Sequence, residues 1–185
     1  MSTKTNMIRN LALAMLVAFT FVCCSSDPEW ADPEAHEKTE QLQKIYSPLM
    51  VGTWHYEKIS DKQRFFERLT FYDDGTLKGL RKWQSRQLVT VDGVQQYTDW
   101  ENVEPLEGAF TGSWSLLYWS PDGREKRNCL QLYATYDNVD REYMAYSFVA
   151  DFAFADATTL CFQGCYVSDG DGRARYLRGE EEPNF

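Results

Sequence analysis

Histidine is the scarcest chemically versatile residue in this sequence. Only His36 and His55 are present, and neither has a cysteine or a second histidine at the spacing of a metal site. The sequence also lacks a Gly-x-Ser-x-Gly turn, a phosphate-binding loop and a His-Glu-x-x-His helix. We therefore expect no enzyme, no catalytic residue, no metal and no cofactor, and we interpret His55 as a polar residue on an outer face.

Positive charge is in short supply as well. The chain has 19 Lys and Arg residues against 28 Asp and Glu residues, which gives a formal net charge of −9. Proteins bind nucleic-acid phosphates mainly through lysine and arginine. The balance therefore predicts no nucleic-acid partner, and the acidity is best explained as a feature that keeps the protein soluble.

No apolar run in the sequence is long enough to cross a bilayer. The longest extends from Leu11 to Val22, is interrupted only by Thr20, and follows the basic residues Lys4 and Arg9. A membrane-spanning helix needs roughly 20 apolar residues. A shorter apolar run behind a basic start is typical of a signal peptide, which we exclude from the fold.

The end of this run resembles the lipobox of bacterial lipoproteins. The segment 21–24 reads Phe-Val-Cys-Cys, and Cys24 follows a small residue whereas Cys23 follows bulky Val22. The resemblance implies that residues 1–23 are removed and that Cys24 is lipidated. The alternative is a plain signal peptide whose cysteines are incidental.

The resemblance also implies where in the cell the protein is located. Lipidation by several acyl chains would hold the protein to a membrane, which is then its first partner. The acidic segment 24–32 begins Cys-Ser-Ser-Asp-Pro-Glu and resembles a tag for export to the cell surface. We therefore expect a lipid-anchored protein of the outer membrane that faces outward, with the periplasmic face as the alternative.

One helix is predicted after this tether, in the segment 33–50. Asp32 is suited to cap it, and Pro33 to occupy its first position. Apolar residues recur at helical spacing up to about residue 47. Pro48 discourages the helix from continuing, so we expect it to span 33–47.

The remainder of the chain reads as β-structure. Aromatic residues make up 15% of the sequence, and they pack well on pleated surfaces. Asp-Gly pairs at 74–75 and 92–93 between apolar runs predict hairpins, and 99–109 reads as a loop. About ten short runs without helices between them favour an all-β, antiparallel up-and-down barrel of eight to ten strands, with a sandwich as the alternative. The expected strands are 53–59, 65–72, 76–84, 88–91, 94–97, 110–119, 126–135, 142–152, 159–162 and 173–178.

Residues 51–178 resemble the lipocalin-like domains of bacterial surface lipoproteins. The motifs that carry the resemblance are Gly52-Thr53-Trp54, Leu69-Thr70-Phe71-Tyr72, Asp74-Gly75-Thr76 and Gly112-Ser113-Trp114. The resemblance implies a barrel that Gly52 and Trp54 help to close. It also implies a cation–π contact on Trp54 from an arginine of the last strand, Arg178 or Arg175.

A barrel of this kind is filled by side chains or just wide enough for a small ligand. We expect a non-enzymatic module that binds a small apolar molecule or a sugar. The alternatives are a structural or interaction subunit with a filled barrel, and a hydrolase with two carboxylates such as Asp151 and Glu57 in one cleft. The aromatic residues expected to face the ligand are Trp83, Tyr97, Trp100, Tyr118 and Trp119.

Three cysteines remain after the lipobox. If residues 162–164 form a three-residue turn, Cys161 and Cys165 face each other and can form a disulfide. A two-residue turn puts them on opposite faces, and free buried thiols are then expected. Cys129 is expected to lie too far from Cys161 to pair with it.

Overall fold

The computed structural model describes residues 32–103, 107–120, 123, 125–136, 145–165 and 167–185. The expected signal peptide, the lipidation residue Cys24 and most of the tether lie outside the described residues. Of the helical structure that is described, none has the length and apolar character needed to cross a membrane.

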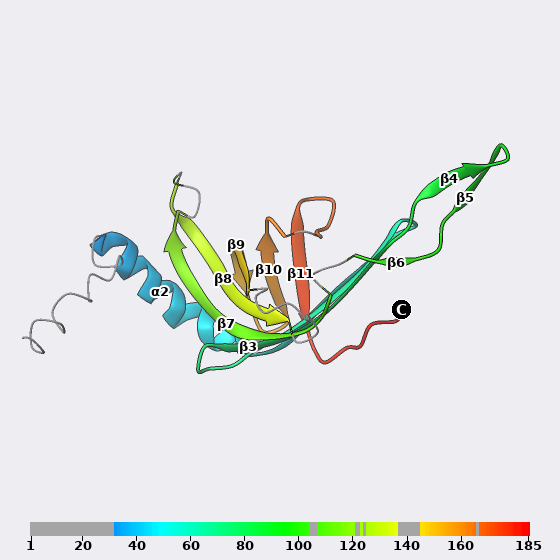
Figure 1. Ribbon diagram of the computed structural model, residues 1–185. Helices are drawn as coiled ribbons and strands as arrows, with labels where there is room; N and C mark the ends of the chain where they lie inside the picture. The colour runs from blue at the N-terminus through cyan, green and yellow to red at the C-terminus, as the bar shows by residue number, and fades with distance from the viewer. Residues whose placement is uncertain (1–31, 104–106, 121–122, 124, 137–144, 166) are drawn as a thin grey trace, which may run out of the picture. The chain divides into compact units, whose positions relative to one another are not determined.

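Eight antiparallel strands close into a barrel (Figure 1). They follow one another around the ring, β2 pairs with β3, and the last strand pairs with the first. The expected all-β, up-and-down barrel is confirmed, because in a sandwich the first and last strands would not join one continuous ring. The strands of the barrel are β1 (Gly52–Ile59), β2 (Gln63–Phe71), β3 (Thr76–Ser85), β7 (Gly108–Trp119), β8 (Arg127–Tyr136), β9 (Ala145–Ala155), β10 (Thr159–Gln163) and β11 (Arg173–Arg178).

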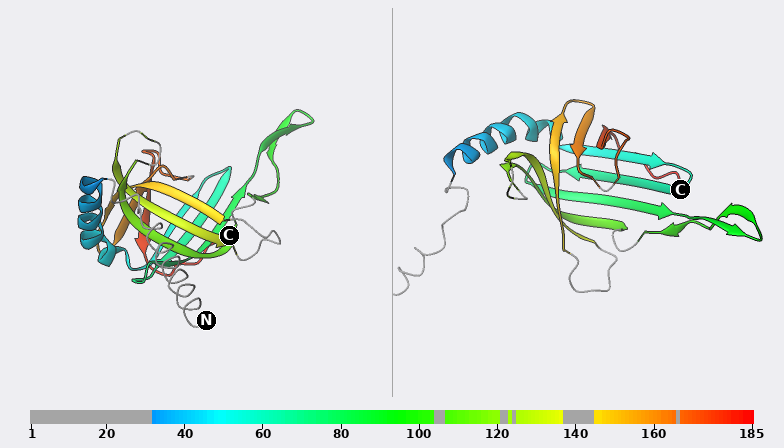
Figure 2. Two further views of the ribbon diagram at one scale, coloured as in Figure 1. Left: turned by 60° about the vertical axis from the view of Figure 1, so that its left-hand side comes forward. Right: turned by 90° about the horizontal axis from the view of Figure 1, so that it is seen from above.

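A hairpin is inserted between β3 and β7. Its strands are β4 (Leu88–Val91) and β5 (Val94–Tyr97), and they pair only with each other and project from the barrel (Figures 1 and 2). Asp92 and Gly93 have φ values of 52° and 79°, which is the geometry of a two-residue hairpin turn. The short strand β6 (Glu101–Asn102) pairs with the end of β3, so the predicted loop 99–109 contains a strand.

The hydrophobic core lies inside the barrel. Alternate residues of each strand point inward, as Phe65, Leu69 and Phe71 do on β2, and they form one buried cluster. A close contact fixes one glycine: a Cβ on Gly79 would lie 2.0 Å from a ring carbon of Phe110. The Phe110 ring therefore packs directly on the backbone of β3, and any larger residue at 79 would displace it.

The helix α2 (Pro33–Met50) is longer than predicted. It begins as expected, since the amide of Ala35 donates to Oδ1 of Asp32 at 3.1 Å. The prediction that Pro48 ends it is wrong, because α2 continues to Met50. Proline lacks one amide hydrogen, but the next turn still closes through the amide of Val51 and the carbonyl of Ser47, 3.2 Å apart.

From Lys38 onward, α2 packs against the barrel. Leu42 is buried, and Tyr46 stacks edge-on against Phe152 with ring centroids 5.0 Å apart. Polar contacts fix the position of the helix, since Gln43 donates from Nε2 to the carbonyl of Leu116 at 2.9 Å. We call the end of the barrel where α2 enters β1 the helix end. The opposite end, where β3 leads into the hairpin, is the loop end.

Candidate functional site

A charged pair lies inside the barrel. Glu67 of β2 and Arg81 of β3 are directly opposite each other in the antiparallel ladder, so their side chains share the inner face. Each residue is only 5% exposed. Arg81 donates from Nε to Oε1 of Glu67 at 2.7 Å and from Nη2 to the same oxygen, and the hydroxyl of Tyr176 donates to Oε2. We call these three residues the interior polar cluster.

Aromatic rings surround the interior polar cluster. The guanidinium carbon of Arg81 lies 5.9 Å from the ring centroid of Phe65 and 6.0 Å from that of Phe110. Trp83, two residues further toward the loop end on the same face, stacks edge-on against Phe65 at 5.8 Å. Its indole N–H is buried and has no hydrogen-bond partner among the described residues. The interior therefore combines apolar rings, a charge pair and an unused donor.

The segment after β10 lies against the loop end of the interior. The hydroxyl of Tyr56 donates to Oδ1 of Asp169 at 3.2 Å, and Nζ of Lys58 donates to the carbonyl of Ser168. Burial, together with the negative charge of Asp169, raises the pKa of Tyr56. Cys165 packs against the core.

The titratable groups near the cluster keep their protons. Burial, followed by the charge of Glu67, raises the pKa of Cys165 to about 12 and the pKa of Tyr176 well above its usual value. At neutral pH both groups are therefore protonated, and the Tyr176 hydroxyl donates its hydrogen bond to Glu67.

At the helix end, the structure brings together the three residues expected to close the barrel. Trp54 is fully buried, and its Nε1 donates to the carbonyl of Met50 at 2.7 Å. The guanidinium carbon of Arg178 lies 4.2 Å from the centroid of the Trp54 ring. A Cβ on Gly52, whose φ is 126°, would lie 2.5 Å from Nη1 of Arg178. A side chain at 52 would therefore both strain the backbone and displace the arginine.

Arg178 also binds the last carbonyls of the helix region. Its Nη2 donates to the carbonyl of Leu49 at 2.7 Å, and its Nη1 to that of Val51 at 3.1 Å. These carbonyls have no partner within a helix, so the side chain caps its end. Arg175, the other arginine considered for contact with Trp54, instead forms ion pairs with Asp169 and Asp171.

The five aromatic residues expected to face a ligand do not gather at one site. Of the five, only Trp83 packs against the hydrophobic core. Tyr97 and Trp100 lie outside the barrel, where the guanidinium carbon of Arg86 is 4.2 Å and 4.4 Å from their ring centroids. Tyr97 is the last residue of the inserted hairpin and Trp100 follows it, so neither shares the barrel interior with Trp83.

The remaining two aromatic residues, Tyr118 and Trp119, are the last residues of β7. The amide of Tyr118 donates to Oγ1 of Thr39 at 3.0 Å, and Nζ of Lys38 is 4.6 Å from the Tyr118 ring centroid. Trp119 is 44% exposed at the end of β7. Neither contributes to the interior.

Other expected pairs are also separated. Asp151 forms an ion pair with Arg127, whereas exposed Glu57 lies on β1, which is separated from β9 by two strands. These two carboxylates therefore do not share a cleft. Among the residues that the structure describes, no group of three or more His, Cys, Asp or Glu side chains is arranged to hold a metal ion.

The three cysteines beyond the lipobox are free, so no disulfide joins Cys161 and Cys165. Cys165 packs against the hydrophobic core inside the barrel. Cys161 lies opposite Arg175 in the antiparallel ladder, and the side chain of Arg175 is on the outside. Residues paired in a ladder share a face, so the two thiols lie on opposite faces of the wall. The alternative of free thiols is the one observed.

The interior polar cluster was missed from the sequence, although a signal was present. Glu67 occupies an inward position of β2 between Phe65 and Leu69, and Arg81 occupies one between Leu77 and Trp83 on β3. A charge in the apolar register of each of two neighbouring strands predicts a buried pair.

In comparisons with family models, curated proteins and solved structures, nothing matches this chain.

Proposed function

We propose that this protein is a lipid-anchored lipoprotein of the cell envelope whose lipocalin-like barrel binds a small molecule without transforming it. The sequence motifs described above support the anchor at Cys24 and the outward-facing location. The barrel and its aromatic interior support the binding role. The expected ligand is a sugar or a small apolar molecule with at least one oxygen that accepts a hydrogen bond.

The observation that carries this proposal is the buried indole N–H of Trp83. A buried donor without a partner costs about 1–3 kcal/mol, and such groups are rare in folded proteins. An acceptor oxygen on a bound molecule would remove this cost. The neighbouring ring of Phe65 would add a stacking contact to the same molecule, and the interior polar cluster would add polar contacts.

Native mass spectrometry of the chain from Ser25 onward, purified from a bacterial host of the native type, tests the proposal. We expect a small-molecule adduct that is retained by the parent and lost in Trp83→Phe, which keeps the ring but removes the N–H. Trp119→Phe is the matched control because Trp119 is exposed and outside the interior. An adduct that survives Trp83→Phe would place the ligand elsewhere.

A second candidate function is supported by the hairpin β4–β5. It exposes four large apolar or aromatic side chains, and an isolated two-stranded hairpin is only marginally stable in water. This favours an interaction subunit in which the barrel itself is inert. A parent protein that carries no adduct but is recovered as a defined complex would favour this candidate. The four exposed residues are Leu88, Val91, Val94 and Tyr97.

A further inference from the structure

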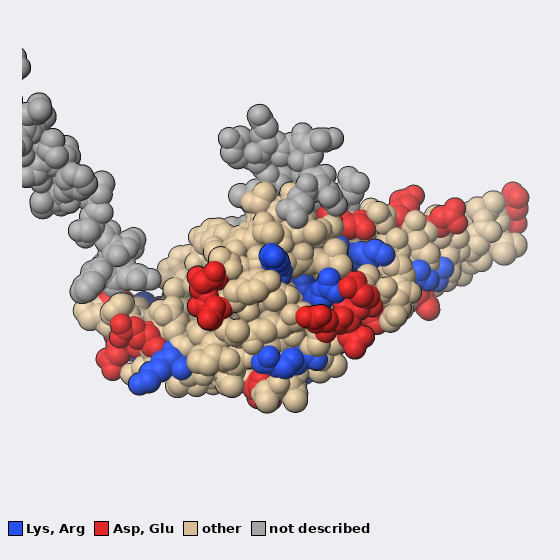
Figure 3. Space-filling model, turned by 90° about the horizontal axis from the view of Figure 1, so that it is seen from below, with Lys and Arg blue, Asp and Glu red and all other residues tan. Residues whose placement is uncertain are grey.

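The outer faces of β2 and β3 form a strip of positive charge on an acidic protein. Outward and inward positions alternate along both strands, and the outward positions carry four cations and no carboxylate. Figure 3 shows basic side chains on the surface beside a group of acidic ones. We call the four cations the basic wall; they are Arg64, Arg68, Lys78 and Lys82.

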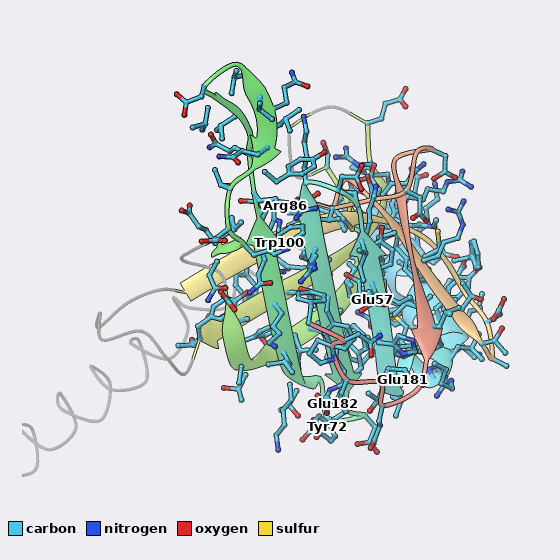
Figure 4. The ribbon with its side chains drawn as sticks, turned by 90° about the vertical axis from the view of Figure 1, so that its right-hand side faces the viewer. Glu57, Tyr72, Arg86, Trp100, Glu181 and Glu182 are labelled. Carbon is cyan, nitrogen blue, oxygen red and sulfur yellow. The ribbon has the colours of Figure 1, made fainter. Side chains whose placement is uncertain are left out.

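Residues 179–185, here called the acidic tail, lie along the basic wall. Arg68 forms an ion pair with Glu182 and also donates to the main-chain carbonyl of Glu181 at 3.3 Å. Nζ of Lys82 donates to the terminal main-chain oxygen of Phe185, the last residue of the sequence, at 2.5 Å. Figure 4 shows Glu181 and Glu182 beside the strands of this wall. The wall therefore binds a side-chain carboxylate, one peptide carbonyl and the terminal oxygen of the tail.

The basic wall also accommodates apolar groups. Phe66 points outward between Arg64 and Arg68, yet it is only 1% exposed. It lines an open cavity of about 450 Å³ that lies beside the wall, between Glu181 and Glu182 of the acidic tail and residues of β1 and β11. The ring centroid of Phe185 lies 5.8 Å from Nζ of Lys82.

The hold of the acidic tail on the wall is weak, and the wall extends beyond it. The side chain of Glu182 is 68% exposed, and ion pairs at such exposure contribute little because water screens them. A second open groove, of about 490 Å³, is lined by Arg68 and Lys78 together with residues of β7. A longer segment could therefore occupy the place of the tail and continue into this groove.

We propose that the basic wall is a docking site for an extended acidic segment of a partner protein, and that the acidic tail occupies this site when no partner is bound. The contacts favour an acidic peptide over a polyanionic glycan, because Arg68 binds a main-chain carbonyl next to a side-chain carboxylate and Lys82 lies near an aromatic ring. The site is on the outer face of the barrel and does not depend on ligand binding in the interior.

The test uses fluorescence anisotropy of a labelled, amidated peptide with the sequence of residues 179–185, added to the full chain from Ser25 onward. The Glu182→Gln variant weakens the tail in its own chain, so we expect the added peptide to bind about two- to fivefold more tightly than to the parent. Glu180→Gln is the matched control, since it removes the same charge from the tail and Glu180 has no ion pair in the described part of the chain. It should leave the affinity unchanged.

Changes in the wall should act in the opposite direction. Arg68→Gln should weaken peptide binding at least about fivefold, because Arg68 contacts both a carboxylate and a carbonyl. Arg173→Gln, a cation on β11, should have no effect. Affinity that does not respond to Arg68→Gln, or that is equal in the parent and Glu182→Gln, would overturn the proposal. If a heparin hexasaccharide displaces the labelled peptide more effectively than unlabelled peptide does, the wall binds polyanions rather than an acidic peptide, and the proposal is overturned.

Discussion

Two ion pairs on opposite faces of β2 show how exposure to solvent determines the contribution of a charge to stability. Glu67 and Arg68 are neighbours in the sequence, but the first points into the barrel and the second points out. The side chains of the inner pair, Glu67 and Arg81, are 7% and 6% exposed. Those of the outer pair, Glu182 and Arg68, are 68% and 26% exposed. The inner pair should therefore govern stability, and the outer pair should govern exchange with other molecules.

Breaking the inner pair should have the largest effect. Glu67→Gln leaves the buried guanidinium of Arg81 without its carboxylate, and such losses cost about 3–5 kcal/mol. Urea unfolding followed by circular dichroism measures the free energy of unfolding. Glu182→Gln is the control for the outer pair and should cost less than about 1 kcal/mol. Similar costs for the two variants would refute the contrast.

Removing only the third member of the interior polar cluster should have a smaller effect. Tyr176→Phe deletes the hydroxyl that donates to Oε2 of Glu67, and hydrogen bonds to charged groups contribute about 1.5–3 kcal/mol. The same unfolding experiment in the Glu67→Gln background tests the assignment. The cost of Tyr176→Phe should shrink there because the partner has lost its charge.

A third arginine, Arg178, is exposed at the helix end, and replacing it should have an intermediate effect on stability. Arg178→Gln removes two hydrogen bonds to carbonyls near the end of α2 and the cation–π contact with Trp54. We expect a loss of about 1–2 kcal/mol. Thermal unfolding would detect it, and Arg173→Gln on the same strand should leave the transition in place.

Breaking the outer pair should have little effect on folding. Arg68→Gln should lower the free energy of unfolding by about 0–1 kcal/mol, and this difference should vanish in 1 M salt, where the screening length is about 3 Å. A loss that persists in high salt would mean that Arg68 acts through packing rather than through charge.

The smallest effect at neutral pH concerns Cys165. Its pKa rises from 9.0 to about 12 in the folded protein, because burial and the charge of Glu67 disfavour the thiolate. The unfolded chain therefore loses this proton first, so stability is fully present below about pH 9 and falls as the pH rises toward 12. Unfolding at pH 8 and pH 10.5 should show a smaller decrease in Cys165→Ala than in the parent. Equal decreases would assign the pH dependence to other groups.

The sequence predicted best those features that depend on local chemistry. Asp92-Gly93 specifies a tight turn by itself, and the alternation of apolar residues specifies the inner face of β2. The placement of Gly52 and Trp54 beside an arginine of the last strand was implied by the resemblance rather than by periodicity. It agrees with the contacts of Arg178.

The sequence predicted less well those features that depend on which elements meet in space. Aromatic content alone could not show that Trp83 is packed against the interior while Trp100 lies outside between Arg64 and Arg86. Pro48 was expected to end the helix because a proline restricts the backbone of the residue before it, and the sequence does not show the contacts that hold the next turn.

The contacts of Arg178 also bear on the order in which the chain folds. Leu49 and Arg178 are 129 residues apart in the sequence, yet one hydrogen bond joins the end of α2 to the last barrel strand. Contacts so distant in sequence form late, because the loop between them must first be closed at an entropic cost. We therefore expect the ring of strands to stay open until residue 178 is in place. Until then β1 and β11 expose unpaired edges, the species most prone to aggregate.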